Sequence, residues 1–576
     1  MKEKWFVITK GGDYRALGAK YGVSPVIARI MRNRGIMTDD EAKAFLNTGV
    51  EGLHDGSLFK DAEKLINVLK AKIEGHKKIR VIGDYDIDGV CSTYILLQGL
   101  KTAGADVDEK IPHRVKDGYG LNENLIRSAY DDGIDTIITC DNGIAAINEI
   151  KLAGELGMTV LVTDHHQVPY EETESGKKEK LVSAEAIVDP HRNGDEYPYK
   201  TICGAVVAWK IIISLFKAMG IDEVNAERFF ELAAFATIGD VMPLSGENRI
   251  IVKNGLLRLE KTDNIGLRAL IAINELDEKS LSPYHVGFIL GPCMNAAGRL
   301  ESAETALQLL MSETAEEAHS YAVTLKDLND SRKALTDKGV KAALEIASLD
   351  EYQKDKILVI ALKDCHESIA GIIAGKVREA TGKPSFILTD GKTADGKDCL
   401  KGSGRSIDEY NMFEGMSKVS ECFLKFGGHA TAAGLSLEKD KLAEFREKIN
   451  AGADLTEDDL AVKVHIDMVI PLNYVTYDLV EELKILEPFG TANEKPLFAA
   501  KDLEVIDGRV LGERRNVYKC RVKDESGTVL DAIYFGEADA FEKHVKEHEK
   551  ISVTFNPDIN EFRGSRTLQL VVRNYM

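Results

Sequence analysis

The sequence is poor in three features, and each shortage restricts what the protein can be. Its eight cysteines are scattered along 576 residues without a C-x-x-C pair, which argues against a disulfide framework or a thiolate zinc site. No apolar segment of the kind found in secretory signals follows Met1. The most apolar window, GAVVAWKIIISLF from Gly204, contains Lys210 and is too short to cross a bilayer. We therefore expect a cytoplasmic protein with reduced thiols and no membrane contact.

Positive charge is also scarce. The chain has 74 lysine and arginine residues against 94 aspartate and glutamate residues, which gives a formal net charge of −20. Taken over the whole chain, this balance argues against a nucleic-acid partner. Binding depends on local basic patches, however, so an acidic chain can still carry a basic groove. Net charge alone leaves the partner open.

The order of hydrophobic runs predicts a multidomain α/β protein. Short apolar runs such as KIRVIG, DTIITC and TVLVT alternate with helical stretches, which indicates a parallel sheet with helices on both faces. A second β/α block begins at KILVIAL, and short alternating strands near the end favour an OB-like barrel. The predicted order is a lead segment (1–60), a parallel-sheet α/β domain (61–312), a connecting helix (313–350), a smaller α/β domain (351–455) and a barrel (456–576).

The stretch DYDIDG places Asp84, Asp86 and Asp88 at every second position. A calcium loop of the D-x-D-x-D-G kind needs a glutamate at its twelfth position and a helix on each side. The twelfth residue here is Ile95, and the preceding KIRVI is typical of a strand. These aspartates therefore do not form a calcium loop.

Each of the three best strands is followed by acidic or imidazole residues. Beyond the DYDIDG aspartates, DTIITC leads into Asp141, and TVLVT leads into Asp164, His165 and His166. Functional groups of an open parallel sheet gather beyond the carboxyl ends of its strands, so we expect these side chains in one crevice. Crowded carboxylates need cations, and oxygen ligands with imidazoles suit two Mn²⁺ or Mg²⁺ ions positioned for hydrolysis of phosphate esters.

Each of these residues, taken alone, could instead have a purely structural role. A single aspartate at the end of a strand is usually a helix N-cap, and a lone pair of histidines is usually surface or core filler. The coincidence of all three clusters at successive strand ends favours the metal site.

These motifs resemble a known family. DYDIDG, CDNGI and TDHH are similar to the first three motifs of the DHH phosphoesterase superfamily, and ATIGDVMPL supplies a fourth aspartate, Asp240. KGSGRS and FGGHATAAG resemble the DHHA1 domain that follows in such proteins. The nearest resemblance is to the RecJ family, and it covers almost the whole chain. It implies a parallel-sheet DHH domain, a connecting helix, a DHHA1 domain and an OB-like barrel.

The resemblance implies a metal-dependent 5′→3′ exonuclease of single-stranded DNA that releases 5′-mononucleotides in DNA repair and recombination. Two Mn²⁺ or Mg²⁺ ions would be held by Asp84, Asp86, Asp88, Asp141, His165 and Asp240. Asp141 would bridge the ions and take part in catalysis. His166 would contact the scissile phosphate, and Asp164 would orient its neighbours.

Further residues are implied to bind substrate. Arg114, Ser403 and Arg405 match positions that cradle a 5′-phosphate in the family, and guanidinium groups suit phosphate because they bind it through two hydrogen bonds. The other expected contacts are Asn295, Arg299 and His429. Without the resemblance, Arg114 would be read as a solvated charge, GSGRS as a flexible turn and the glycines of GGHATAAG as packing residues.

Two further expectations concern the barrel and Cys293, a position that differs from the family pattern. Basic and aromatic residues on a barrel suit single-strand binding that tolerates any sequence. The residues in question are Arg514, Arg515, Tyr518, Lys519, Arg521, Phe562, Arg563 and Arg566. Cys293 stands where the family usually has arginine, which is expected to remove a cation from the path of the DNA.

Two other functions stay open. A relative that hydrolyses short oligonucleotides or cyclic dinucleotides would share the metal site, and a non-catalytic replication scaffold would share the fold. The expected partners are single-stranded DNA, preferably with a 5′-phosphate, together with a helicase and a single-strand-binding protein. We expect a monomer.

Overall fold

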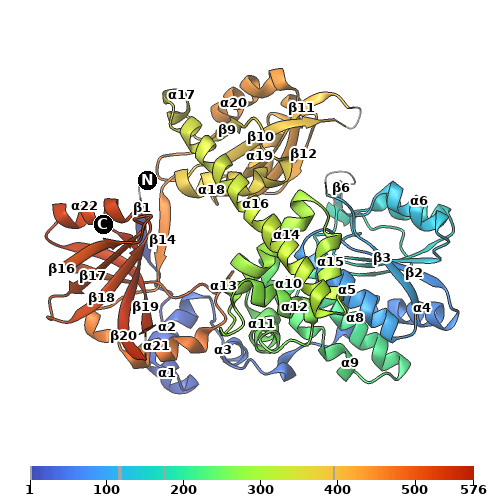
Figure 1. Cartoon of the computed structure of the whole chain (residues 1–576), viewed down its shortest axis with the longest axis horizontal. Coiled ribbons are helices and arrows are strands. Elements are labelled where there is room, and N and C mark those ends of the chain that lie inside the picture. Colours follow the sequence, from blue (N-terminus) through green and yellow to red (C-terminus); the bar gives the residue numbers. More distant parts are fainter. Residues whose placement is uncertain (1–2, 115–117, 119, 174–175, 394–395, 563) are drawn as a thin grey trace.

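The computed structural model describes residues 3–114, 118, 120–173, 176–393, 396–562 and 564–576. Figure 1 shows a first α/β domain at the right, a second at the top and a barrel at the left, with the long helix α16 (Ala315–Ala347) running between the two α/β domains. Both chain termini lie at the barrel (Figure 1). Within the described residues, no helix has the length and apolar character needed to cross a membrane.

The first domain is built on a five-stranded sheet in the order β3-β2-β4-β5-β8, and every neighbouring pair is parallel. Its strands are β2 (Lys78–Ile82), β3 (Asp106–Lys110), β4 (Thr136–Cys140), β5 (Thr159–Thr163) and β8 (Ala186–Val188). β4 is buried along its whole length, as expected for a central strand covered on both faces. The predicted parallel sheet is confirmed.

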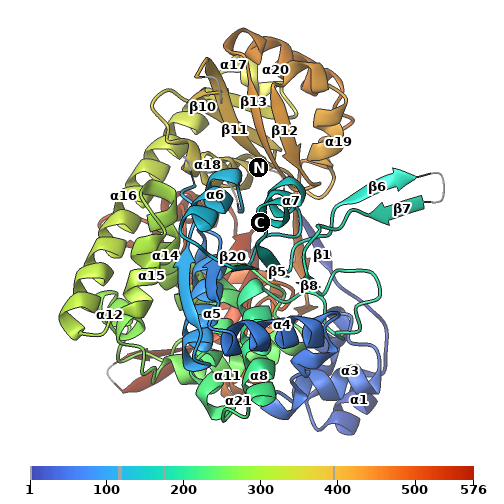
Figure 2. The ribbon, with the colours of Figure 1, turned by 90° about the vertical axis from the view of Figure 1, so that its right-hand side faces the viewer.

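Helices cover both faces of this sheet because its side chains alternate between them. Ile138 joins the core formed with α4 (Ala62–Glu74), α5 (Ile87–Thr102) and α8 (Gly204–Met219). Its neighbour Ile137 points into a separate core on the opposite face. That core contains α6 (Glu123–Asp131) and α7 (Ile147–Glu155). A hairpin of β6 (Tyr170–Thr173) and β7 (Gly176–Glu179) projects from this domain (Figure 2).

A helical block completes the first domain and leads into the connecting helix. Its helices are α9 (Val224–Glu227), α10 (Phe230–Gly239), α11 (Gly246–Leu259), α12 (Ile265–Ile273), α13 (Pro283–His285), the π-helical turn η3 (Val286–Leu290), α14 (Gly291–Leu300) and α15 (Glu304–Met311). The predicted connecting helix is α16, which is 33 residues long and capped by the Thr314 side chain. It packs on α12 and α14 at one end and on α18 (Ala370–Thr381) at the other. α16 therefore holds the two α/β domains at a fixed separation.

The second domain has a mixed five-stranded sheet in the order β12-β13-β11-β10-β9. The strands are β9 (Leu358–Ala361), β10 (Ser385–Lys392), β11 (Asp398–Arg405), β12 (Lys425–Gly428) and β13 (Ala432–Leu437). β9 and β10 are parallel and the remaining pairs are antiparallel.

The third domain is a closed barrel. Its strands run in the order β15-β16-β17-β18-β20-β19, and pairing of β16 with β19 closes it. They are β15 (Met468–Val469), β16 (Phe498–Leu511), β17 (Val517–Lys523), β18 (Val529–Phe535), β19 (Ile551–Phe562) and β20 (Ser565–Tyr575). Closure leaves few unpaired strand edges, and the predicted barrel is confirmed.

The N-terminal segment packs against this barrel. β1 (Glu3–Val7) pairs in parallel with β14 (Val462–Ile466) just before the barrel begins. Ile27 and Ile30 of α2 (Pro25–Asn33) are fully buried in the barrel core. The first and last parts of the chain therefore share one hydrophobic core.

Arg249 of α11 fastens this unit to the first domain. Its side chain is 1% exposed, and its guanidinium donates hydrogen bonds to the carbonyls of Phe45 (3.1 Å), Leu486 (2.7 Å) and Ile485 (2.8 Å). We expect Arg249→Met to lower the free energy of unfolding by about 3–5 kcal/mol, because one buried and two partly buried carbonyls lose their donors. Urea denaturation measures this loss.

The control is Arg258→Met on the same helix, where the guanidinium is 44% exposed and pairs with Glu227. An exposed pair contributes little, so this variant should stay within about 0.5 kcal/mol of wild type. Equal stability of the two variants would contradict a fastening role for Arg249.

Candidate active site

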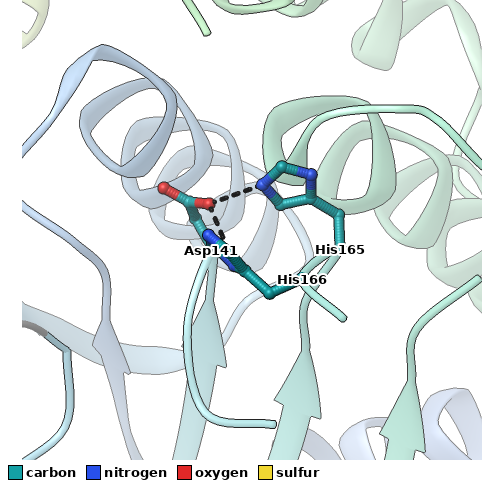
Figure 3. A group of neighbouring side chains, drawn as sticks. All are labelled: Asp141, His165 and His166. Atoms are coloured by element: carbon teal, nitrogen blue, oxygen red, sulfur yellow. Dashed lines mark hydrogen bonds and ion pairs between the residues drawn. The ribbon is translucent and has the colours of Figure 1, made fainter. Parts of the chain in front are cut away.

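The carboxyl ends of β2, β4 and β5 meet at one edge of the first sheet, and the residues after them lie together. His165 is the centre of the cluster. Its Nε2 lies 3.0 Å from Asp141 Oδ1, 3.5 Å from Asp88 Oδ2 and 3.8 Å from Asp240 Oδ2. His166 Nδ1 lies 4.0 Å from the same oxygen, Asp141 Oδ1, so both histidines face one carboxylate oxygen (Figure 3).

Helix N-termini hold two of the DYDIDG aspartates in place. Asp86 caps α5, where its carboxylate accepts hydrogen bonds from the backbone N–H groups of Asp88 and Gly89. The Asp88 carboxylate accepts from the N–H groups of Gly204 (2.6 Å) and Ala205 (2.8 Å) at the start of α8. Such N–H groups and the dipole of the helix favour negative charge. The Asp88 carboxylate is thus held in a fixed position facing the cluster.

Asp141 occupies a strained turn directly after β4. Its φ of 58° lies in the left-handed region, which aspartate and asparagine tolerate better than other non-glycine residues. Gly204 packs against it so closely that a Cβ there would lie 2.8 Å from Asp141 Cβ. The turn directs one oxygen of the Asp141 carboxylate toward both histidine rings (Figure 3).

The Asp164 carboxylate orients both histidines through hydrogen bonds. Its carboxylate accepts hydrogen bonds from the N–H of Ile144 (2.9 Å), the N–H of His165 (2.7 Å) and Nδ1 of His166 (2.8 Å). Burial lowers the pKa of His166, but the hydrogen bond and charge of Asp164 outweigh it and raise the pKa to about 9. Burial lowers the pKa of His165. At neutral pH the His165 imidazole is therefore neutral and suited to be a metal ligand, whereas His166 is a protonated imidazolium.

The carboxylates are crowded beyond what a site without cations can hold in ionised form. Burial, followed by the charge of Asp86, raises the pKa of Asp84 to about 8, and burial with Asp88 does the same for Asp240. Burial and then Asp88 raise the pKa of Asp141 well above its usual range. A bound cation would reverse these shifts.

The donor set fits divalent metal ions. Three groups have ligand atoms within 4.8 Å of one another: Asp84, Asp86 and Asp141; Asp88, His165 and Asp240; Asp141, His165 and His166. Within the described part of the chain, Asp84 Oδ2 is buried and has no hydrogen-bond partner. Carboxylate oxygens with imidazole nitrogen match Mn²⁺ or Mg²⁺ rather than a metal that prefers thiolates.

A cavity of about 490 Å³ lies between the first and second α/β domains, lined by Tyr85, Arg114, Ser368, Lys401 and Lys425 among others. We call it the interdomain cavity. The Arg114 guanidinium lies 4.7 Å from the centre of the Tyr85 ring, a cation–π contact that holds it beside the acidic cluster. The cavity is therefore lined by three cations, Arg114, Lys401 and Lys425, and one carboxylate, Glu367, next to the acidic cluster.

Ser403 and Arg405 follow Lys401 and Gly402 on β11, which line this cavity, but neither of the two lines it. Burial, followed by the charges of Arg378 and Arg114, lowers the pKa of Arg405, so Arg114 and Arg405 lie within each other's field. A Cβ on Gly371, at the start of α18, would lie 2.9 Å from the Arg405 guanidinium. The glycine therefore lets the guanidinium lie flat against the helix start.

Lys401 is a cation that the sequence interpretation missed. It occupies the same face of β11 as Ser403 and Arg405, two and four residues away, and it lines the interdomain cavity. Its ammonium pairs with Glu367 at 3.1 Å. The alternation in KGSGRS was the signal that could have identified it.

The three other expected substrate residues have different surroundings. Asn295 Oδ1 accepts a hydrogen bond from the N–H of Ile87 at 2.8 Å, which fixes the start of α5. Arg299 donates to the carbonyl of Ser368 at 2.9 Å and so joins the two α/β domains. His429 is exposed in the turn between β12 and β13 and does not line the interdomain cavity. Their contact with substrate remains a prediction.

One expectation about the DNA path is wrong. Tyr518 is 3% exposed and packs on Phe541 inside the barrel, so its ring is not available to stack on a base. Cys293 is fully buried next to Asn329 of α16, and its effect on the path of the DNA stays a prediction. The periodicity of short strands did not reveal which face of β17 points inward.

Most of the barrel cations are neutralised. Arg515 pairs with Asp539, and Arg521 pairs with Asp507 at 2.6 Å. Lys519 and Arg566 also face carboxylates. Arg563 lies outside the described residues. The barrel face carries less free positive charge than its composition suggested.

Comparison with known proteins agrees with this architecture. Three family models match: the N-terminal domain of the DHH family over residues 78–237, the DHHA1 domain over 354–453 and the RecJ OB domain over 466–574. The Bacillus subtilis single-stranded-DNA-specific exonuclease RecJ is 33% identical over 100% of this chain and 71% of its own length. Its Escherichia coli counterpart is 31% identical over 96% of this chain and 95% of its own length.

A solved structure shows the same arrangement of domains. The structure of RecJ from Thermus thermophilus in complex with Mn²⁺ superposes with a TM-score of 0.84 and 26% identity, covering 100% of this chain and 80% of that one. A Mg²⁺ complex of the same protein also matches, with a TM-score of 0.78. The sequence motifs, the order of domains and these relatives lead to one conclusion: the chain belongs to the RecJ family.

Proposed function

We propose that the protein is a metal-dependent exonuclease that degrades single-stranded DNA from the 5′ end and releases 5′-mononucleotides. The observation that carries the proposal is the contact between two features: a buried cluster of carboxylates with His165, and the cationic interdomain cavity beside it. The relatives named as single-stranded-DNA-specific exonucleases support the same reading.

The chain's own residues have distinct tasks in this reaction. Asp84, Asp86, Asp88, Asp141, His165 and Asp240 hold two Mn²⁺ or Mg²⁺ ions. When bound, such a pair polarises a water for attack on phosphorus and stabilises the departing oxygen. His166, protonated against Asp164, donates a hydrogen bond to the scissile phosphate and stabilises its developing charge. Arg114, Ser403 and Arg405 bind the terminal phosphate, which sets the distance from the end to the bond that is cut.

The test is a time course on a single strand labelled at its 3′ end, with Mn²⁺ and with a chelator. We expect 5′-mononucleotides and a shrinking 3′-labelled strand only when metal is present. Shortening from the 3′ end, or cutting inside a circular strand, would overturn the proposal.

The alternative of a cyclic-dinucleotide phosphodiesterase shares the acidic cluster. A cyclic dinucleotide has no terminal phosphate, so it leaves the cations of the interdomain cavity without a partner. A non-catalytic scaffold needs no complete set of metal ligands, yet here every ligand type is present and converges. Both alternatives are therefore disfavoured.

We further propose that the protein works in the cytoplasm as a monomer, on strands opened by a helicase and covered by a single-strand-binding protein. A strand-specific enzyme needs duplex to be unwound before it can act, which supports a helicase as supplier. Mass photometry at working concentration tests the monomer, and coupled degradation of duplex with an added helicase tests the partnership.

Arg405→Ala should narrow the preference for a 5′-phosphate over a 5′-hydroxyl. A terminal phosphate has more charge and more free oxygens than an internal one, so loss of a guanidinium penalises it more. We expect kcat/KM to fall about 10-fold or more for 5′-phosphorylated strands and less for 5′-hydroxyl strands. Initial rates on both strands measure the ratio.

The matched control is Arg378→Ala, which removes the same charge from the neighbouring helix α18. The Arg378 guanidinium donates to the Ser406 carbonyl and to Glu379. This control should leave the preference between termini close to that of wild type. Equal slowing of both strands by Arg405→Ala would show that Arg405 does not recognise the terminus.

A further inference from the structure

Helix α14 connects the metal-binding loop of the first domain to the second domain. It packs on α16, on α5 of the first domain and on the turn η4 (Glu367–Ile369) of the second domain. Figure 1 shows it beside α16, where the first α/β domain faces the second. Ser368 of η4 lines the interdomain cavity. One short helix therefore contacts both of the domains that form this cavity.

At its first-domain end, α14 holds the backbone on both sides of Asp86. Asn295 Oδ1 accepts a hydrogen bond from the N–H of Ile87 at 2.8 Å. A Cβ on Gly298 would lie 2.4 Å from the carbonyl oxygen of Tyr85, so glycine is what lets the helix approach the loop this closely. Tyr85 and Ile87 are the chain neighbours of Asp86. These two contacts therefore fix the peptide groups that carry a candidate metal ligand.

Arg299 fastens the same helix to the second domain. Its guanidinium donates a hydrogen bond to the Ser368 carbonyl at 2.9 Å. In the described part of the chain, no other hydrogen bond runs directly from the first α/β domain to the second. Burial, followed by the charges of Arg114 and Arg332, lowers the pKa of Arg299 to about 10. The guanidinium is therefore still charged at neutral pH, and a charged donor makes a strong hydrogen bond.

The orientation of the two α/β domains decides where the strand is cut. In the proposed reaction the ions lie on the first domain, whereas Ser403 and Arg405 of the terminal-phosphate site lie on the second. α16 fixes the separation of these domains, but one helix alone leaves them free to tilt about its ends. The hydrogen bond from Arg299 to Ser368 is a second link beside α16, and it removes this freedom. The distance between the two sites therefore depends on α14.

We propose that α14 is the spacer that sets the distance from the metal ions to the terminal-phosphate site at one nucleotide. Asn295 and Gly298 hold its metal end, and Arg299 holds its second-domain end. This inference rests on the proposed function and adds what selects the bond that is cut. Asn295 and Arg299 are then positioning residues, which act through Asp86 and Ser368. The two ends have separable effects, because one holds a metal ligand and the other holds a domain.

The first test removes the link to the second domain. Arg299→Met and the milder Arg299→Lys are mixed in excess with a single strand labelled on its 5′-phosphate, so that the first cut decides the length of the labelled product. Without the link the terminal phosphate can shift relative to the ions. We expect the ratio of labelled di- and trinucleotides to mononucleotide to rise about ten-fold or more with methionine, and less with lysine.

Arg332→Met is the matched control for this test. Arg332 lies on α16, near Arg299, and its guanidinium donates to Asn329 on the same helix. Its loss removes the same charge without breaking a link between the domains. The control should therefore release labelled mononucleotide in the same proportion as wild type.

The second test disturbs the metal end of α14. Asn295→Leu removes the acceptor for the Ile87 N–H, so the Kd for Mn²⁺, measured by calorimetry without DNA, should rise about 10–100-fold. Asn295→Asp keeps an acceptor oxygen and should restore most of the affinity. In saturating Mn²⁺ both variants should still release mononucleotides, because the Arg299 link is intact. Arg299→Met should bind Mn²⁺ as wild type does, which also shows that its first domain is folded.

Product length separates a spacer from a substrate contact. A residue that only touches the substrate raises KM when it is lost, and its variant still releases mononucleotides. Unchanged product length with Arg299→Met, or unchanged Mn²⁺ affinity with Asn295→Leu, would therefore overturn the inference. If Arg299→Met fails to bind Mn²⁺, the product ratio of Arg299→Lys decides in its place. Absence of labelled mononucleotide from wild type would instead count against the proposed function.

Discussion

Asp141→Asn should lower the rate of hydrolysis by more than the 10²–10³-fold that loss of a single transition-state donor causes. The Asp141 carboxylate belongs to two of the groups of candidate ligand atoms, so in the proposed two-ion site its loss should weaken the binding of both ions. Asparagine keeps the shape of the side chain and tolerates the left-handed turn at φ 58°, whereas alanine would add strain there. The measurement is kcat in saturating Mn²⁺.

The same variant should be at least as stable as wild type when metal is removed. Burial and then Asp88 raise the pKa of Asp141, so its ionisation opposes folding once the pH exceeds the unfolded value of 3.8. This penalty grows with pH until the folded pKa is reached. Without metal, the stability gained by Asp141→Asn should therefore be larger at pH 8 than at pH 5, as measured by urea denaturation.

Asp502→Asn is the matched control, since Asp502 is exposed on β16 and also has a positive φ, of 55°. It should change neither turnover nor the pH dependence of stability. Turnover by Asp141→Asn close to wild type would contradict the assignment of Asp141 as a bridging ligand.

His166→Ala should reduce kcat by about 10²–10³-fold while both ions still bind. His166 Nδ1 donates to the Asp164 carboxylate at 2.8 Å, so Nε2 is the ring nitrogen that we assign to the phosphate. Because its proton is retained up to a pKa of about 9, the imidazolium offers a charged donor at neutral pH. Calorimetric titration with Mn²⁺, alongside kcat, separates catalysis from metal binding.

The neighbouring His165→Ala is the control with the opposite expectation. His165 Nε2 lies among three carboxylates, so its removal should weaken Mn²⁺ binding. If His166→Ala instead loses a bound ion and His165→Ala keeps both, the two histidines have exchanged roles.

The parts of the site that the sequence predicted are those governed by a local rule. Asp84, Asp141 and His165 each follow a buried strand, and parallel strands bring their carboxyl ends to one edge. Asp240 obeys no such rule: it caps the C-terminus of α10, and only the resemblance to a family drew attention to it. Which helix end reaches the cluster depends on packing between distant elements.

The orientation of side chains in the barrel could not be predicted from the sequence either. The sequence showed basic residues on strands, but not that Asp507 on β16 lies opposite Arg521 on β17. Cross-strand partners depend on register, which the hydrophobic pattern of short strands specifies poorly. The lead segment posed the same difficulty, since nothing near β1 indicates β14 as its partner.

The pairing of β1 with β14 also has a consequence for how the protein is made. Glu3 leaves the ribosome about 460 residues before its partner Val462, a delay on the order of a minute at usual rates of synthesis. Throughout that time β1 presents an unpaired edge, and the apolar side of α2 lacks the barrel that will bury it. A nascent chain in this state is a natural client for a chaperone. Crowding of such chains on one messenger would favour pairing between neighbours before each barrel is complete.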